Sequence, residues 1–184
     1  MTILSRIPSL LNAVFFPQRY HERGLKELVR RGLKLGRGVY IHPSVIIDND
    51  VPWLISIGDD CTFSANVVIL AHDASPQDYL GYVKIDKVTI GSRAFVGAGS
   101  IILPGVNIGT NVIVGAGSVV TRGIPDNSVA AGNPARVIES TSEFIEKHRK
   151  NLPSRPRRIR GKALERPEIR ELIQKALSNG PYYV

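Results

Sequence analysis

The sequence contains a single cysteine, Cys61, so no intrachain disulfide can form. A chain without disulfides is typical of a reducing compartment, and we expect this one in the cytoplasm. Long hydrophobic runs are also missing, because no stretch approaches the roughly 20 apolar residues that cross a bilayer. Residues 1–16 are interrupted by Arg6, Pro8 and Asn12, which is unfavourable for a secretory signal peptide.

Acidic residues are absent from residues 147–162, and this stretch alone accounts for the formal net charge of +8. It contains eight Lys and Arg residues, so the rest of the chain is neutral. It has no aromatic side chain that could stack on a base, which argues against nucleic acid as a partner. We interpret it as a solvated linker, with an acidic membrane surface or the phosphates of a cofactor as alternative partners.

The chain does have a period of six between residues 90 and 121. An aliphatic residue opens every hexad: Ile90, Val96, Ile102, Ile108, Val114 and Val120. An α-helix repeats near 3.6 and an amphipathic strand at 2, so neither produces this period. A short extended run with an inward aliphatic residue and a Gly-tolerant corner forms one face of a prism. Three faces close a coil, and coils stack about 4.8 Å apart. The pattern predicts an all-β fold, a parallel β-helix of hexapeptide repeats.

The same spacing reaches back to residue 35 and gives the register of four coils. Their inward residues are at positions 35, 41 and 47, then 57, 63 and 69, then 90, 96 and 102, then 108, 114 and 120. Ile57 follows Ile47 by ten residues and Ile90 follows Ile69 by twenty-one, instead of six. Two excursions therefore leave from the same corner of the prism. Because loops on a rigid scaffold often form sites, we expect a pocket at this corner.

Helical patterns flank the coils. Residues 22–34 form an amphipathic pattern that predicts a helix capping the first coil, with these residues on its apolar face: Leu25, Leu28, Val29 and Leu33. Residues 3–16 could add a second apolar helix that ends at Pro17, and peripheral attachment of this end to a membrane is the alternative interpretation.

After Val120 the hexads decay into a Pro-rich closing pair of strands. Ser140 and Glu143 form a capping box for a following helix, with three residues expected to face inward: Phe144, Ile145 and Leu152. Pro167 and Gly180 bracket a last apolar-faced helix. We therefore divide the chain into an N-terminal helical cap, a β-helix domain with a loop at 71–87, and a C-terminal helical extension: residues 1–34, 35–138 and 139–184.

His72, in the larger excursion, is the candidate catalytic residue. It stands three residues past Ile69, and Asp50 stands three past Ile47, so the register places the two side chains about 5 Å apart on successive coils. An imidazole can take the proton of an attacking hydroxyl, and a carboxylate can orient the ring or the acceptor. A surface histidine without a catalytic role is the alternative. Cys61 lies inside a hexad, where we expect an inert, packed thiol.

The segments ILAHDAS, at 69–75, and KVTIGSRAF to GNPARVI, at 87–138, resemble the hexapeptide-repeat acyltransferases. Within that family the likeness is greatest to O-acetyltransferases of the maltose, galactoside and polysaccharide type. The resemblance spans residues 35–140. It implies a left-handed coil, a homotrimer with active sites between neighbouring subunits, and acetyl-CoA as the donor.

The resemblance also implies roles for individual residues around the acceptor. His72 matches the family's general base, and Asp50, together with Asn49, matches the short acidic run that holds the acceptor. We also expect Asp73 beside the acceptor. Asp73 stands where the sugar acetyltransferases have proline, and this variant is more typical of enzymes in surface-polysaccharide pathways.

The donor positions follow from the same resemblance. Phe95, Ala98 and Ala116 match residues along the pantetheine arm, and Phe95 replaces the tryptophan often found there. Thr121 and Arg122 match residues near the nucleotide end, and Arg136 one near the phosphates. Tight packing at the corners is an alternative explanation of the two alanines.

These observations predict an enzyme that moves an acetyl group from acetyl-CoA to a hydroxyl of a sugar or a surface-polysaccharide precursor. N-acetylation of an amino sugar and a non-catalytic trimeric scaffold that binds sugar remain alternatives. A β-helical carbonic anhydrase needs three histidines around zinc, but only His42 and His72 lie within the coils. We therefore expect no metal.

Overall fold

The computed structural model describes residues 17–150 and 166–177. The chain divides into two compact units, Met1–Thr141 and Ser142–Val184. The helix predicted at residues 3–16 and most of the basic stretch lie outside the described residues. Among the described residues, no helix is both long and apolar enough to cross a membrane.

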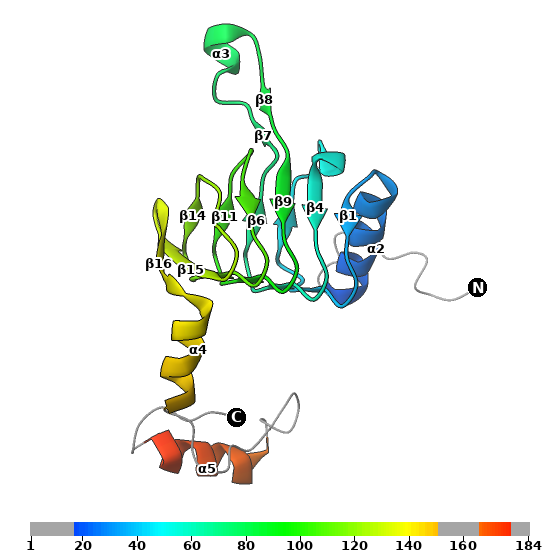
Figure 1. Cartoon of the computed structure of the whole chain (residues 1–184). Helices are drawn as coiled ribbons and strands as arrows, with labels where there is room; N and C mark the ends of the chain where they lie inside the picture. Colours follow the sequence, from blue (N-terminus) through cyan, green and yellow to red (C-terminus); the bar gives the residue numbers. More distant parts are fainter. Residues whose placement is uncertain (1–16, 151–165, 178–184) are drawn as a thin grey trace, which may run out of the picture. The chain divides into compact units, whose positions relative to one another are not determined.

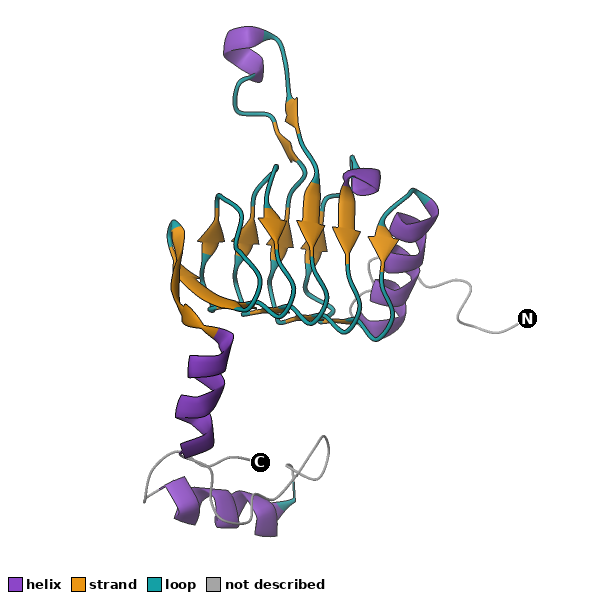
Figure 2. Ribbon diagram, viewed as in Figure 1, coloured by secondary structure: helices purple, strands orange, loops and turns teal. Residues whose placement is uncertain are grey.

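The first unit is a stack of parallel coils with three sheets as its faces (Figures 1 and 2). Sheet A contains β1 (Lys34–Leu35), β4 (Ile55–Ile57), β9 (Val88–Ile90) and β12 (Asn107–Ile108). Sheet B contains β2 (Tyr40–Ile41), β5 (Thr62–Phe63), β10 (Phe95–Val96), β13 (Ile113–Val114), β15 (Ser128–Gly132) and β16 (Ala135–Ser140). Sheet C contains β3 (Ile46–Ile47), β6 (Val68–Ile69), β11 (Ile101–Ile102) and β14 (Val119–Val120).

The strand register agrees with the hexad spacing at every predicted pairing. In sheet A, Ile90 pairs with Ile57 on one side and Ile108 on the other. The corresponding partners in sheets B and C also follow the predicted order. The inward residues are buried, since Phe63 and Ile69 are both 0% exposed. The core is therefore a column of stacked aliphatic and aromatic side chains.

The N-terminal helix α2 (Pro17–Arg30) lies beside β1, the edge strand of sheet A (Figure 1). Leu25 and Leu28 pack against the core, as predicted, and Leu33 is buried just beyond the helix. Val29 was assigned wrongly to the apolar face, because it is 44% exposed. The helix also ends earlier than predicted, and a turn at Gly32 leads into β1.

The C-terminal end of the coil stack is closed by β15 and β16, which pair antiparallel as the predicted strand pair. Thr141 links the end of β16 to the last coil, because its Oγ1 donates a hydrogen bond to the Asn111 carbonyl at 2.8 Å. Helix α4 (Thr141–Lys150) begins at this residue and continues into the second unit, in which α5 (Pro167–Leu177) begins at the predicted proline. Ile145 was expected to face inward, but it is 46% exposed.

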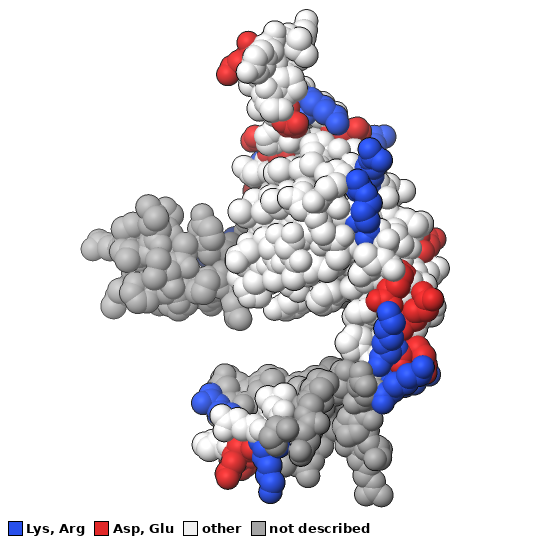
Figure 3. All heavy atoms as spheres, turned by 90° about the vertical axis from the view of Figure 1, so that its left-hand side faces the viewer, with Lys and Arg blue, Asp and Glu red and all other residues white. Residues whose placement is uncertain are grey.

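Both excursions leave the corner between sheets C and A. The first contains η2 (Pro52–Leu54). The second, predicted as a loop, is a hairpin of β7 (His72–Asp73) and β8 (Lys84–Ile85) with α3 (Gln77–Leu80) at its tip. It projects from the coil stack (Figure 1). Acidic and basic side chains gather on this hairpin, while much of the coil surface visible in Figure 3 is uncharged.

Candidate functional site

The centre of the site is a contact between His72 and a buried carboxylate, Asp48. The Nδ1 atom of His72 lies 2.6 Å from Oδ2 of Asp48, whose side chain is 0% exposed. The same oxygen accepts the backbone N–H groups of Ala71 at 2.9 Å and His72 at 3.1 Å. The other oxygen accepts the Asp50 N–H at 3.0 Å. The Asp48 carboxylate is therefore hydrogen-bonded to backbone groups at the start of each excursion.

The protonation of Asp48 follows from these contacts. Burial pushes its pKa upward, but hydrogen bonds from Ala71, the His72 ring and Asp50 outweigh burial, so the pKa lies below its usual value. An ionised Asp48 has no proton to donate, so its hydrogen bond with the His72 ring requires the ring proton to be on Nδ1. The Nε2 atom of His72 is then left with a free lone pair, as a general base requires.

The Asp50 carboxylate lies on the other side of the ring. Its Oδ2 is 3.9 Å from His72 Nε2, and the side chain is 77% exposed. The register had placed these two side chains about one coil spacing apart. Sequence reasoning missed Asp48, although its position directly after the inward Ile47 was the available signal. A residue one step past an inward strand position reaches the corner and can contact the next coil.

Asn49 lies in the first excursion and Asp73 in the second. Asn49 is exposed and accepts a hydrogen bond from Arg31 at 2.9 Å. Asp73 begins the exposed part of the hairpin and accepts the Ser75 N–H at 2.9 Å. This backbone hydrogen bond is the main reason that the pKa of Asp73 lies below its usual value.

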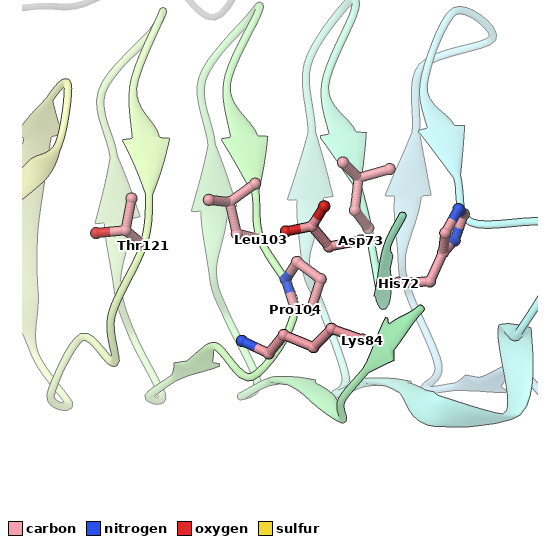
Figure 4. Close-up of a pocket in the computed structure, with 7 residues that line it drawn as sticks. His72, Asp73, Lys84, Leu103, Pro104 and Thr121 are labelled. Atoms are coloured by element: carbon pink, nitrogen blue, oxygen red, sulfur yellow. The ribbon is translucent and has the colours of Figure 1, made fainter. Parts of the chain in front are cut away.

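A pocket of about 260 Å³ extends from His72 along the corner between sheets C and A. It is lined by Leu70, His72, Asp73, Lys84, Leu103, Pro104 and Thr121. Figure 4 shows these side chains following successive coils, with the Lys84 side chain pointing from β8 toward the Thr121 end. Lys84 was not predicted from the sequence, because its place beside Asp73 depends on the hairpin register.

The residues predicted to hold the donor do not lie together in this chain. Thr121 lines the pocket at the corner between sheets C and A. Ala98 and Ala116 are exposed at the next corner, between sheets B and C, and Phe95 faces outward from sheet B with 43% of its surface exposed. Two further predicted donor residues are exposed: Arg122, just past β14, and Arg136, in β16.

The ligand atoms of Asp48, Asp50 and His72 lie within 4.8 Å of one another, close enough to surround a metal ion. Asp48 Oδ2 already accepts three hydrogen bonds, including the one from the His72 ring. Only His72 Nε2 and the Asp50 carboxylate face outward, whereas a catalytic zinc site has three protein ligands. The geometry therefore fits a base better than a metal centre.

Cys61 is buried at 0% exposure, with its Sγ 3.1 Å from the Gly91 carbonyl. Burial raises the pKa of its thiol, so the thiol stays protonated at neutral pH. A nucleophilic role for this residue is unsupported by its environment.

The comparisons with known proteins agree with this architecture. A family model described as "Hexapeptide repeat of succinyl-transferase" matches residues 55–71 and 87–122, which are the second to fourth coils without the hairpin. YvoF of Bacillus subtilis (strain 168) is 35% identical over 119 residues, which cover 65% of this chain and 67% of that protein. The galactoside O-acetyltransferase of Lactococcus lactis subsp. lactis (strain IL1403) is 39% identical over 110 residues, 58% of this chain and 52% of that enzyme.

A solved structure is also similar. The crystal structure of a maltose O-acetyltransferase from Clostridium difficile 630 has a TM-score of 0.52 and 30% identity, and the match covers 67% of this chain and 77% of that one. The matches thus span from about half to about three quarters of the length of these relatives. The chain belongs to the hexapeptide-repeat acetyltransferase family and has its left-handed parallel β-helix fold.

Proposed function

We propose that this protein transfers an acetyl group from acetyl-CoA to a hydroxyl of a sugar, with His72 as the general base. The observation that carries the proposal is the short contact between His72 Nδ1 and the buried Asp48 carboxylate. It fixes the ring orientation and leaves Nε2 as the proton acceptor. The named activities of the galactoside and maltose relatives support a sugar hydroxyl as the acceptor.

The proposed reaction is a direct transfer. His72 Nε2 takes the proton of the hydroxyl while its oxygen attacks the thioester carbonyl, forming a C–O bond and a tetrahedral intermediate. The C–S bond then breaks, and the imidazolium returns its proton to the departing CoA sulfur. The products are a sugar acetate and free CoA thiol. An alcohol is a weak nucleophile at neutral pH, so a positioned base contributes about 10²–10⁴ in rate.

The pocket suggests how the substrates approach His72. Thr121, predicted near the nucleotide end of the donor, and His72 lie at opposite ends of the labelled row in Figure 4. Leu103 and Pro104 between them offer apolar surface to an uncharged pantetheine arm. The acceptor would enter from the other side of His72, where Asn49 and Asp50 are exposed.

We further propose that the working protein is a homotrimer with sites between subunits. The outward residues of sheet A are polar: Lys34, Ser56, Thr89 and Asn107. Those of sheets B and C are mainly apolar: Tyr40, Thr62, Phe95, Ile113, Ile46, Val68, Ile101 and Val119. Two unlike apolar faces suit a ring in which sheet B of one copy meets sheet C of the next. Such a ring could bring the corner that contains Ala98 and Ala116 in one copy to the pocket of the neighbouring copy.

A direct assay tests the proposed function. Purified protein is mixed with acetyl-CoA and, separately, maltose, a methyl galactoside, glucosamine and a uronic acid, and free CoA thiol is measured. We expect thiol release that depends on a sugar hydroxyl, with an acetyl ester as the product. An amide product from glucosamine alone would replace the proposal with N-acetylation. No release above the acceptor-free rate would overturn acetyl transfer and leave a sugar-binding scaffold.

A further inference from the structure

Arg31 contacts the first excursion at atoms that Asp48 does not contact. It lies one residue past the end of α2, and its Nη1 donates to Asn49 Oδ1 at 2.9 Å. Its Nη2 makes a longer contact, 3.4 Å, to the Asp50 backbone oxygen. Arg31 thus contacts both excursion residues that the sequence assigns to the acceptor, although α2 was predicted only to cap the coils.

The contact determines which end of the Asn49 amide faces a ligand. A guanidinium group has donors and no acceptor, so it must meet the amide oxygen and not the amide nitrogen. The Nδ2 group of Asn49, with its two N–H donors, is therefore turned away from Arg31. Since Asn49 is exposed, these donors are available to a bound molecule.

The backbone of Asp50 is held by one contact on each side of its Cα atom. Its N–H donates to Asp48 Oδ1 at 3.0 Å, and its carbonyl oxygen is contacted by Arg31. Its carboxylate makes neither of these contacts and lies 3.9 Å from His72 Nε2. The segment therefore presents a hydrogen-bond acceptor, the Asp50 carboxylate, beside the proposed base, and a hydrogen-bond donor, the Asn49 amide nitrogen, on the preceding residue.

We propose that Arg31 is a positioning residue that holds Asn49 and Asp50 in place to bind the acceptor. This inference rests on the proposed function. One sugar hydroxyl loses its proton to His72, a neighbouring hydroxyl donates to Asp50, and another sugar oxygen accepts from Asn49 Nδ2. The acceptor class that fits this pattern is a sugar with vicinal hydroxyls, because a simple alcohol offers only the first of the three contacts.

The test compares Arg31→Met with Arg30→Met. Arg30 is the preceding residue and pairs with Glu27 at 2.6 Å on the exposed helix end, away from the contacts to Asn49 and Asp50. Steady-state rates are measured with acetyl-CoA and the fastest sugar of the panel above. For Arg31→Met we expect the acceptor KM to rise about tenfold, as for the loss of a hydrogen bond from a charged group, with the acetyl-CoA KM unchanged. Arg30→Met should behave as wild type.

Two further variants separate positioning from general damage to the fold. Arg31→Lys keeps a charged donor group but loses the two separate guanidinium nitrogens that contact Asn49 and Asp50, so its acceptor KM should lie between those of wild type and Arg31→Met. Asn49→Asp keeps an oxygen for Arg31 and removes the N–H donors, so it should raise the acceptor KM as well. Hydrogen exchange in peptides covering residues 46–54 should accelerate in Arg31→Met and stay unchanged in Asn49→Asp.

The outcomes distinguish this inference from the proposed function. Active wild-type enzyme with an unchanged acceptor KM in Arg31→Met overturns the role of Arg31 and leaves acetyl transfer standing. A rise in the KM of both substrates also overturns it, because the substitution then disturbs the whole site and not the acceptor side alone. If wild type transfers acetyl to no sugar, the proposed function fails and this inference fails with it.

Discussion

Asp48 lies on one coil and His72 on the next, yet the carboxylate of the first accepts the ring N–H of the second at 2.6 Å. The carboxylate is wholly buried and accepts four N–H groups in all, three at Oδ2 and one at Oδ1. A change at Asp48 should therefore alter both the chemistry of His72 and the stability of the corner.

Asp48→Asn should lower kcat by about 10²-fold or more. An asparagine at this position offers one oxygen and an N–H₂ group, which opposes the donors that meet Asp48, so the ring loses its fixed tautomer. We expect the acetyl-CoA KM to change little, because the proposed donor site lies along the coil corner, away from Asp48. Steady-state kinetics check this expectation, and kcat within a few-fold of wild type would mean that Asp48 has no part in the reaction.

The stability contributed by Asp48 should depend on pH. Its pKa in the folded protein lies below the reference value of 3.8, so the folded state favours the ionised form. The contribution is then fully present well above pH 3.8 and is lost as the pH falls through the lower, folded-state pKa. Urea unfolding of wild type and Asp48→Asn from pH 7 to pH 3 should show a gap of about 1–3 kcal/mol that narrows once the pH falls below 3.8. A gap independent of pH would contradict this assignment.

A charge on sheet C should disrupt the proposed trimer, whereas the same charge on sheet A should not. Ile46 faces outward from sheet C and is 59% exposed, while Thr89 faces outward from sheet A and is also exposed. We expect a trimeric mass for wild type and Thr89→Glu by light scattering, and a smaller mass with reduced turnover for Ile46→Glu. A monomeric wild type would remove the model of sites shared between subunits.

Two glycines should respond to alanine in opposite directions. A Cβ on Gly91 would lie 2.6 Å from the Gly109 carbonyl carbon in the next coil, so Gly91→Ala should destabilise the fold by about 1–3 kcal/mol. Gly24 lies in α2 with no atom within 4 Å of a built Cβ, so Gly24→Ala should stabilise it by about 0.5–1 kcal/mol. Thermal unfolding measures both changes, and equal shifts in the two variants would contradict this account of coil packing.

The fold could be predicted because a β-helix repeats one local rule. An inward aliphatic residue every six positions sets both the strand and its partner, so Ile90 and Ile108 are paired by counting alone. The ends were less predictable. The apolar spacing of α2 did not reveal that Val29 points away from the core, because that depends on how the helix lies on the first coil.

The site could be predicted only in part, for a physical reason. Register places Asp50 near His72, since both stand three residues past paired strand positions. Register does not say which carboxylate the imidazole selects. Asp48 is closer because it is at the start of the corner, where its oxygens also meet backbone N–H groups of the second excursion. Arg31 contacts this segment from outside the repeat, so the hexad pattern carried no signal for it.

The kinetics of His72→Ala test the central claim most directly. Acetyl transfer to the best sugar of the panel is followed by release of CoA thiol, with Cys61→Ala as the control. We expect His72→Ala to lower kcat by about 10²-fold or more with little change in the acetyl-CoA KM, while Cys61→Ala retains the wild-type rate. Near-normal turnover by His72→Ala, or an acetyl group trapped on Cys61, would contradict the direct transfer with His72 as base.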